Sequence, residues 1–177
     1  MDGMNYVDHK TPFMVSTGST ISLLATYQPL VPAANLPIMG NNYFNWVGKA
    51  VRIRAFGAST SAATPGNFTC SMLYGDGSPA AGVTIGGLQA GWTANLANQS
   101  WMLDMIVRCR ALGPVGTLLG VGTFLMQGWG QGQVSPFNVS PQPCDLTQPF
   151  YLNVQWQRSG STAETIVLHD LMNEALN

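Results

Sequence analysis

Short runs of alternating side chains, separated by glycines and prolines, recur along the whole chain. The clearest run lies within residues 46–60, where apolar side chains take turns with arginines. One side of this run holds Val51, Ile53 and Ala55, and the other holds Arg52, Arg54 and Phe56. Because successive side chains of a strand point to opposite faces, this pattern predicts a half-buried strand.

Similar patterns predict further strands, and no window of a dozen residues keeps helical spacing behind a capping residue. The other predicted strands are residues 13–15, 21–24, 68–74, 100–110, 115–127, 150–157 and 165–171, with at most a short strand at 83–85 and a turn at 16–19. Roughly eight to ten short strands divided by Gly and Pro turns indicate an all-β, two-sheet antiparallel β-sandwich of the jelly-roll kind.

The 177 residues are enough for one domain with a sizeable core. We expect an extended N-terminal arm over residues 1–42, with short strands, and a jelly-roll domain over residues 43–177. Prolines break the apolar segments of the arm, which suits edge strands or an extended path. The apolar residues of the arm must then be buried either in this subunit's own core or on the surface of a neighbour.

Charge is scarce: Asp, Glu, Lys and Arg make up 8% of the chain, against about 25% in a typical soluble domain, and the net charge is −1. Low net charge favours association, so we expect an assembly of copies rather than a free monomer. A nucleic-acid binder should carry a basic patch, and a net charge near zero argues against one. No apolar run reaches the ~18 residues of a membrane helix, and the N-terminus does not read as a signal peptide. We therefore expect no nucleic-acid or membrane partner, and synthesis in a host cytoplasm.

The three cysteines, Cys70, Cys109 and Cys144, are far apart and form no CxxC motif. Such a count fits neither a disulfide framework nor a zinc site. Cys70 and Cys109 lie in predicted strands and read as small buried apolar residues. Cys144, next to a proline, is expected in a loop.

Titratable side chains are too few and too scattered to suggest a catalytic site. His169 and Asp170 are adjacent, but neighbours along a strand point to opposite faces, so we expect that they do not meet. Asp104 lies on a polar strand face beside Arg108, where a cross-strand ion pair with Arg52 or Arg54 is expected to be structural. No phosphate-binding loop or acidic calcium loop is present, so we predict no catalytic residue, no metal and no cofactor.

Several aromatic residues fall in or near predicted loops. They could anchor an interface, stack on sugars or cap the open ends of the sandwich. Together with apolar residues of the arm they form the candidate interface: Leu30, Val31, Leu36, Tyr43, Trp92, Trp129 and Phe137.

In their order and spacing, several segments resemble tailed-phage virion proteins of the jelly-roll head-decoration or head-fibre type. These segments are residues 47–55 with Gly57 and 59–60, residues 66–69, residues 101–104 leading to Arg108, residues 152–156 and residues 164–168. The resemblance spans roughly residues 43–172 and implies trimers of jelly rolls on the outside of a capsid. It implies no activity and no catalytic residues.

The sequence thus predicts a non-enzymatic phage capsid decoration protein, a homotrimer on the outer surface of the head whose partners are itself and the major capsid protein. The alternative is a receptor- or carbohydrate-binding module of a tail or fibre, with a cell-surface glycan held by aromatic loops. A hydrolytic virion enzyme is the third hypothesis, which the scarcity of His and acidic residues disfavours.

Overall fold

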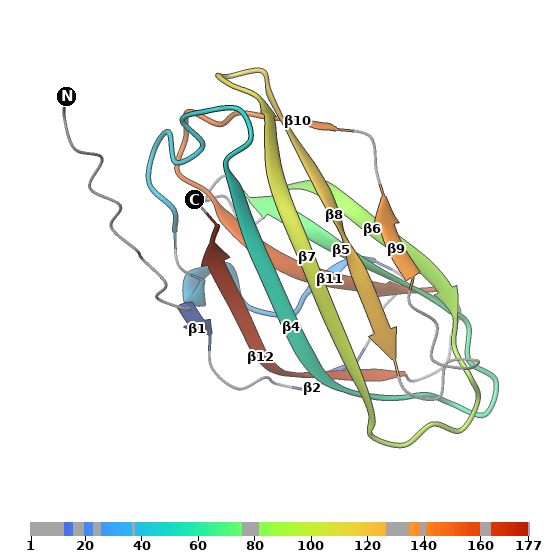
Figure 1. Ribbon diagram of the computed structural model, residues 1–177. Coiled ribbons are helices and arrows are strands. Elements are labelled where there is room, and N and C mark those ends of the chain that lie inside the picture. Colours follow the sequence, from blue (N-terminus) through green and yellow to red (C-terminus); the bar gives the residue numbers. More distant parts are fainter. Residues whose placement is uncertain are drawn as a thin grey trace, which may run out of the picture.

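The computed structural model describes residues 13–15, 20–22, 26–36, 38–75, 82–126, 135–138, 141–159 and 164–176. Within them the chain forms two antiparallel sheets packed face to face (Figure 1). The prediction of an all-β, two-sheet sandwich is therefore confirmed. Only a short 3-10 helix, η1 (Ala33–Asn35), interrupts the described strands, and no helix in the described part is long and apolar enough to cross a membrane.

The larger sheet has eight strands and the smaller sheet has four. The larger sheet contains β1 (Phe13–Val15), β2 (Thr20–Ser22), β4 (Ala50–Thr60), β7 (Gln99–Ala111), β8 (Gly116–Met126), β9 (Ser135–Asn138), β10 (Gln142–Cys144) and β12 (Thr165–Ala175). The smaller sheet contains β3 (Gln28–Pro29), β5 (Asn67–Gly75), β6 (Gly82–Gly91) and β11 (Tyr151–Arg158).

The strand pairs are nested along the chain. The outermost pair is β4 with β12, the next is β5 with β11, and the innermost is the β7–β8 hairpin. Between them, β6 lies against β9 and β10 across the two sheets. This is the order of a long hairpin rolled onto two layers, as in a jelly roll, although β5 and β6 also pair as a hairpin within the smaller sheet.

Alternating side chains from both sheets fill the space between the layers. Val51, Ile53 and Ala55 of β4 are fully buried, as the alternation predicts. An aromatic cluster joins the layers: Trp156 stacks on Phe68 with ring centroids 5.1 Å apart and meets Trp101 edge-on at 5.3 Å. Large apolar side chains removed from water in this way supply most of the stability of a sandwich.

The described parts of the N-terminal segment lie along this subunit's own sheets. β1 and β2 both pair with β12 and run in the same direction, so they are not the two arms of a hairpin. The turn expected at residues 16–19 lies outside the described residues. β3 pairs with β11, and Met39 forms a bridge with Phe150.

Two expectations about the strands need correction. The segment expected to hold at most a short strand is the ten-residue β6, in which glycines allow close approach to β5. Tyr151, Asn153 and Gln155 of β11, expected outward and polar, are buried. The Asn153 amide donates to the Val31 carbonyl at 2.7 Å, which places the segment after β3 over the outer side of β11.

All three cysteines are free and buried, as expected for Cys70 and Cys109. Cys144 is not in a loop. It ends β10, where its backbone pairs with Gly116 of β8, because a proline-containing segment can serve as an edge strand.

Candidate interaction surfaces

We call the outer face the side of the larger sheet that points away from the core, formed by the outward residues of β12, β4, β7 and β8. Among its polar and charged residues it carries these large apolar side chains: Phe56, Met102, Ile106, Leu119, Val121, Leu125, Val167 and Met172. The exposed fractions of Phe56, Met102 and Val121 are 44%, 39% and 48%. A sheet face turned to water normally carries polar residues, so these exposed apolar side chains make the outer face a candidate contact surface.

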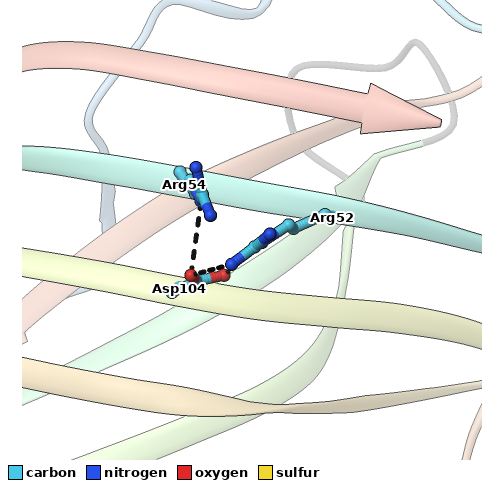
Figure 2. A network of polar contacts seen from close by, with 3 residues as sticks. All are labelled: Arg52, Arg54 and Asp104. Carbon is cyan, nitrogen blue, oxygen red and sulfur yellow. Dashed lines mark hydrogen bonds and ion pairs between the residues drawn. The ribbon is translucent and has the colours of Figure 1, made fainter. Parts of the chain in front are cut away.

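An ion cluster lies in the middle of the outer face (Figure 2). The Arg52 guanidinium donates to both carboxylate oxygens of Asp104, with Nε–Oδ1 at 2.8 Å and Nη2–Oδ2 at 2.5 Å. Arg54, directly opposite Asp104 in the β4–β7 register, adds an Nε–Oδ2 bond at 3.3 Å. The hydrogen bonds from Arg52, with the charges of both arginines, hold the pKa of Asp104 below its usual value even though partial burial opposes the shift.

The outer face carries one more arginine than it has carboxylates. Its arginines are Arg52, Arg54, Arg108 and Arg110, and its carboxylates are Asp104, Asp170 and Glu174. Glu174 lies opposite Arg52 in the β12–β4 register and attracts it. The structure thus brings Asp104 together with Arg52 and Arg54, and leaves Arg108 exposed nearer the end of β7.

A shallow depression marks one end of the outer face. Phe56, Met102, Leu125 and His169 line its rim, and Gly57 and Trp101 lie below them. A β-bulge in β12 places His169 there, because the register with β4 shifts between Leu168 and Asp170. The expectation that His169 and Asp170 point to opposite faces is therefore wrong: after the bulge Asp170 lies opposite the outward residue Phe56, and both acidic and imidazole side chains lie on the outer side.

The second surface, which we call the loop end, is the end of the sandwich where β4 begins and β7 ends (Figure 1). Gly48 donates its backbone N–H to the Cys109 carbonyl at 2.9 Å, so the loop before β4 follows the last residues of β7. Leu146 likewise bonds the carbonyl of Gly113 in the β7–β8 turn at 3.1 Å. Five large apolar side chains are exposed on these loops: Ile38, Trp46, Val47, Leu112 and Val115.

The loop end is also basic. Among the described residues, Lys49, Arg108 and Arg110 form no ion pair. Lys49 lies over the rings of Tyr43 and Trp46, with its Nζ 4.2 and 4.5 Å from the ring centroids, and partial burial lowers its pKa. The nearby carboxylate of Asp145 is already engaged by the N–H and hydroxyl of Thr147, whose hydrogen bonds lower the pKa of Asp145.

Most of the predicted interface residues are buried within the subunit itself. Leu30, Val31, Leu36 and Trp92 are buried in this subunit's own core, which corrects their assignment as interface anchors. Leu30 bonds the Val154 carbonyl at 2.8 Å, so the segment after β3 is covered by its own sheet rather than by a neighbour. Trp92 packs on Phe68 with ring centroids 5.2 Å apart and caps the end of the core opposite the loop end.

The remaining three candidates differ in their surroundings. Tyr43 is half-buried at the loop end, where its ring meets Phe150 edge-on at 5.9 Å and burial raises its pKa. Phe137 belongs to β9, where its backbone lies opposite Gly122, and its side chain is not among those that the structure describes. Trp129 lies outside the described residues.

Most of the exposed apolar residues are not among the predicted interface residues. The outward position of Phe56 could be predicted, because it falls on the same side of the alternating run in β4 as the arginines. Val121 and Met102 also alternate with buried neighbours, so their outward position could be predicted. Trp46, Val47 and Val115 are in loops, where periodicity gives no information about exposure.

Neither a family model nor a curated protein matches the sequence. Among solved structures, the chain is similar to a legume lectin-like domain from Entamoeba histolytica, with 9% identity, a TM-score of 0.35, and 89% of this chain and 97% of that chain covered. It is also similar to the protein of T=1 particles derived from infectious bursal virus, with 12% identity, a TM-score of 0.27, and 94% of this chain and 32% of that chain covered. The chain thus spans about a third of that particle protein, and both TM-scores are too low to carry a function to this chain.

Proposed function

We propose that the chain is a non-enzymatic structural protein of a phage virion, which decorates the outside of the head as a homotrimer and contacts the major capsid protein through the loop end. The observation that carries this proposal is the group of exposed apolar side chains at the loop end, beside cations that form no ion pair within the part of the chain that the structure describes. Val115 and Ile38 are 82% and 63% exposed. In a chain with so few charged residues, such a group is best explained by a partner that covers it.

The chemistry of the loop end defines the shell surface that would fit it. Apolar side chains need apolar contacts, and Lys49, Arg108 and Arg110 need carboxylates. The partner surface is therefore apolar at its centre and acidic at its rim. Because the loops are held by backbone hydrogen bonds to β7 and to each other, they can bind without a large ordering cost.

A trimer would strengthen this contact. Three loop ends joined in one particle bind three neighbouring sites, and each contact after the first is intramolecular. A weak single contact then becomes firm attachment that clamps adjacent capsid subunits. This role requires no chemistry from the protein.

The test uses purified protein and heads of the phage whose genome encodes it. Wild-type protein should sediment with the heads, and the double variant Val47→Asp with Val115→Asp should lose at least tenfold in affinity because two carboxylates enter an apolar, acid-facing contact. Ala94→Asp, an exposed change at the opposite end of the sandwich, is the matched control and should bind normally. Equal binding by all three proteins would refute the loop end as the attachment surface.

Exposed Trp46 favours a second candidate function, glycan binding. An indole ring beside a lysine offers a stacking face and a hydrogen-bond donor, which together suit a sugar. A glycan array separates the two functions. Binding of one glycan class that Trp46→Ala abolishes, with no binding to heads, would favour the receptor- or carbohydrate-binding module.

A further inference from the structure

We infer that Lys49 is a preformed anchor at the loop end that binds one carboxylate of the partner, an Asp or Glu side chain bordered by apolar groups. This inference rests on the proposed attachment to the capsid and goes further, because it assigns recognition of the carboxylate to a single residue. The Lys49 Nζ lies 4.2 Å from the ring centroid of Tyr43 and 4.5 Å from that of Trp46. It also donates a hydrogen bond to Asn45 Oδ1 at 3.3 Å. Three contacts therefore hold the ammonium group in place before any partner arrives.

Backbone and ring contacts join this anchor to the body of the sandwich. The Lys49 carbonyl accepts the N–H of Cys109 at 2.9 Å, and the Lys49 N–H donates to the Trp46 carbonyl at 3.3 Å. The Tyr43 ring meets the fully buried ring of Phe150 edge-on at 5.9 Å. A side chain that is already ordered loses little freedom when it binds, so more of the contact energy appears as affinity.

The ammonium group has no countercharge within the part of the chain that the structure describes. The faces of aromatic rings attract a cation, but the rings carry no net charge, so the positive charge of Lys49 is not neutralised. None of the described carboxylates pairs with Lys49, and that of Asp145 is engaged by Thr147. Partial burial already removes some of the water around Lys49 and lowers its pKa. A carboxylate therefore gains an ion pair at a lower desolvation cost than it would with a fully hydrated cation.

Arg108 and Arg110 are less suited to this role. Both are exposed near the end of β7, and no contact with another described residue holds either guanidinium in place. Ordering such a side chain on binding costs conformational entropy, and an exposed ion pair contributes little. We therefore expect the two arginines to add general attraction to an acidic surface, while Lys49 selects the position of one carboxylate.

The surroundings of the anchor define the rest of the ligand. Trp46 and Val47 belong to the same loop as Lys49, and their exposed fractions are 43% and 60%. When a partner covers these side chains, water leaves the neighbourhood of the ion pair and the electrostatic attraction becomes stronger. A carboxylate beside an aliphatic side chain should therefore bind better than a carboxylate alone.

The direct test uses the full chain and two short peptides, so it does not depend on phage heads. In an NMR titration at millimolar concentrations, N-acetyl-Glu-Leu-amide should shift the signals of the Trp46 indole and of Lys49. N-acetyl-Gln-Leu-amide, which has nearly the same shape but no charge, should bind about fivefold more weakly. Lys49→Met keeps the apolar stem and should remove the difference between the peptides, whereas Arg110→Met removes a cation from the same end and should preserve it. Equal binding of both peptides by the wild-type chain, or an unchanged difference in Lys49→Met, would overturn the inference.

A second measurement connects the anchor to attachment. Lys49→Met should weaken sedimentation with heads about tenfold and reduce its dependence on salt, whereas Arg110→Met should weaken it about twofold or less. If wild-type protein and Lys49→Met bind heads equally well, the anchor is refuted and the proposed attachment stands. If wild-type protein does not bind heads but the Glu peptide still binds through Lys49, the attachment is refuted and the anchor stands.

Discussion

The guanidinium of Arg52 binds the carboxylate of Asp104 at two points, diagonally across β4 and β7. Arg54 bonds the same carboxylate from its position directly opposite, so one acid on β7 is held by two arginines on β4 (Figure 2). The arrangement fixes the register of the two central strands of the larger sheet. A shift by one residue would place the arginines in the core and Ile53 in water.

Replacing Asp104 with Asn should make stability less sensitive to acid. The pKa of Asp104 is lowered in the folded protein, so its carboxylate contributes stability above its unfolded pKa of about 3.9, and this contribution is lost as the pH falls through the lower folded value. At pH 7 we expect Asp104→Asn to reduce the free energy of unfolding by about 1 kcal/mol, given partial exposure. Urea unfolding at pH 7 and at pH 3 checks this, because the difference between the two proteins should become smaller at the lower pH. A constant difference would contradict the assignment.

A second, more deeply buried ion pair joins the last residue of β11 to the residue before β12. Arg158 Nη1 lies 3.1 Å from Glu164 Oε2, and the side chains are 13% and 1% exposed. Glu164→Ala should lower the free energy of unfolding by about 3 kcal/mol, because it leaves the arginine without its partner. The double variant Arg158→Met with Glu164→Leu should lose clearly less, since no buried charge remains. Denaturant unfolding of both proteins gives the comparison, and equal losses would show that the pair is not the cause.

Gly57 is predicted to be intolerant of any side chain. A Cβ at this position would overlap the Val167 carbonyl and approach the Trp101 ring, at the place where β12 bulges. Gly57→Ala should therefore destabilise the sandwich by about 2–4 kcal/mol through forced movement of β12. Gly40→Ala is the control, because a Cβ there meets no atom within 4 Å. Thermal unfolding that is equal for the two variants would contradict the close approach.

The strands that could be predicted are those whose two faces differ. In β4 and β7 every second residue is buried, so alternation alone gave the strand and the direction of each side chain. It also placed Asp104 on the side of Arg52 and Arg54. The register that brings these three together depends on pairing between distant segments, which a period-two pattern does not encode.

The remaining strands differ from what alternation predicts for identifiable reasons. β6 is rich in glycine, and β9 and β10 contain prolines, so their strand conformation comes from pairing with neighbours and not from local preference. The alternation in β11 predicts a half-exposed strand, but the polar residues on its outer side are buried, and the Asn153 amide is hydrogen-bonded to Val31 in the segment after β3. The bulge at His169 leaves no mark in the sequence, and it reverses the expected relation to Asp170.

The buried thiols provide a test of the core itself. Burial raises the pKa of Cys144 to about 12 and the pKa of Cys70 well above its usual value, and it also raises the pKa of Cys109. Because only the thiolate reacts, a group with a pKa near 12 is about 0.01% ionised at pH 8. Native protein should therefore take up no maleimide or iodoacetamide over hours at pH 8, and all three cysteines should be labelled at once in denaturant, as measured by intact mass. Rapid labelling of Cys144 alone in the native protein would show that β10 opens readily from the edge of β8, and labelling of Cys70 would show that the two layers are not packed as described.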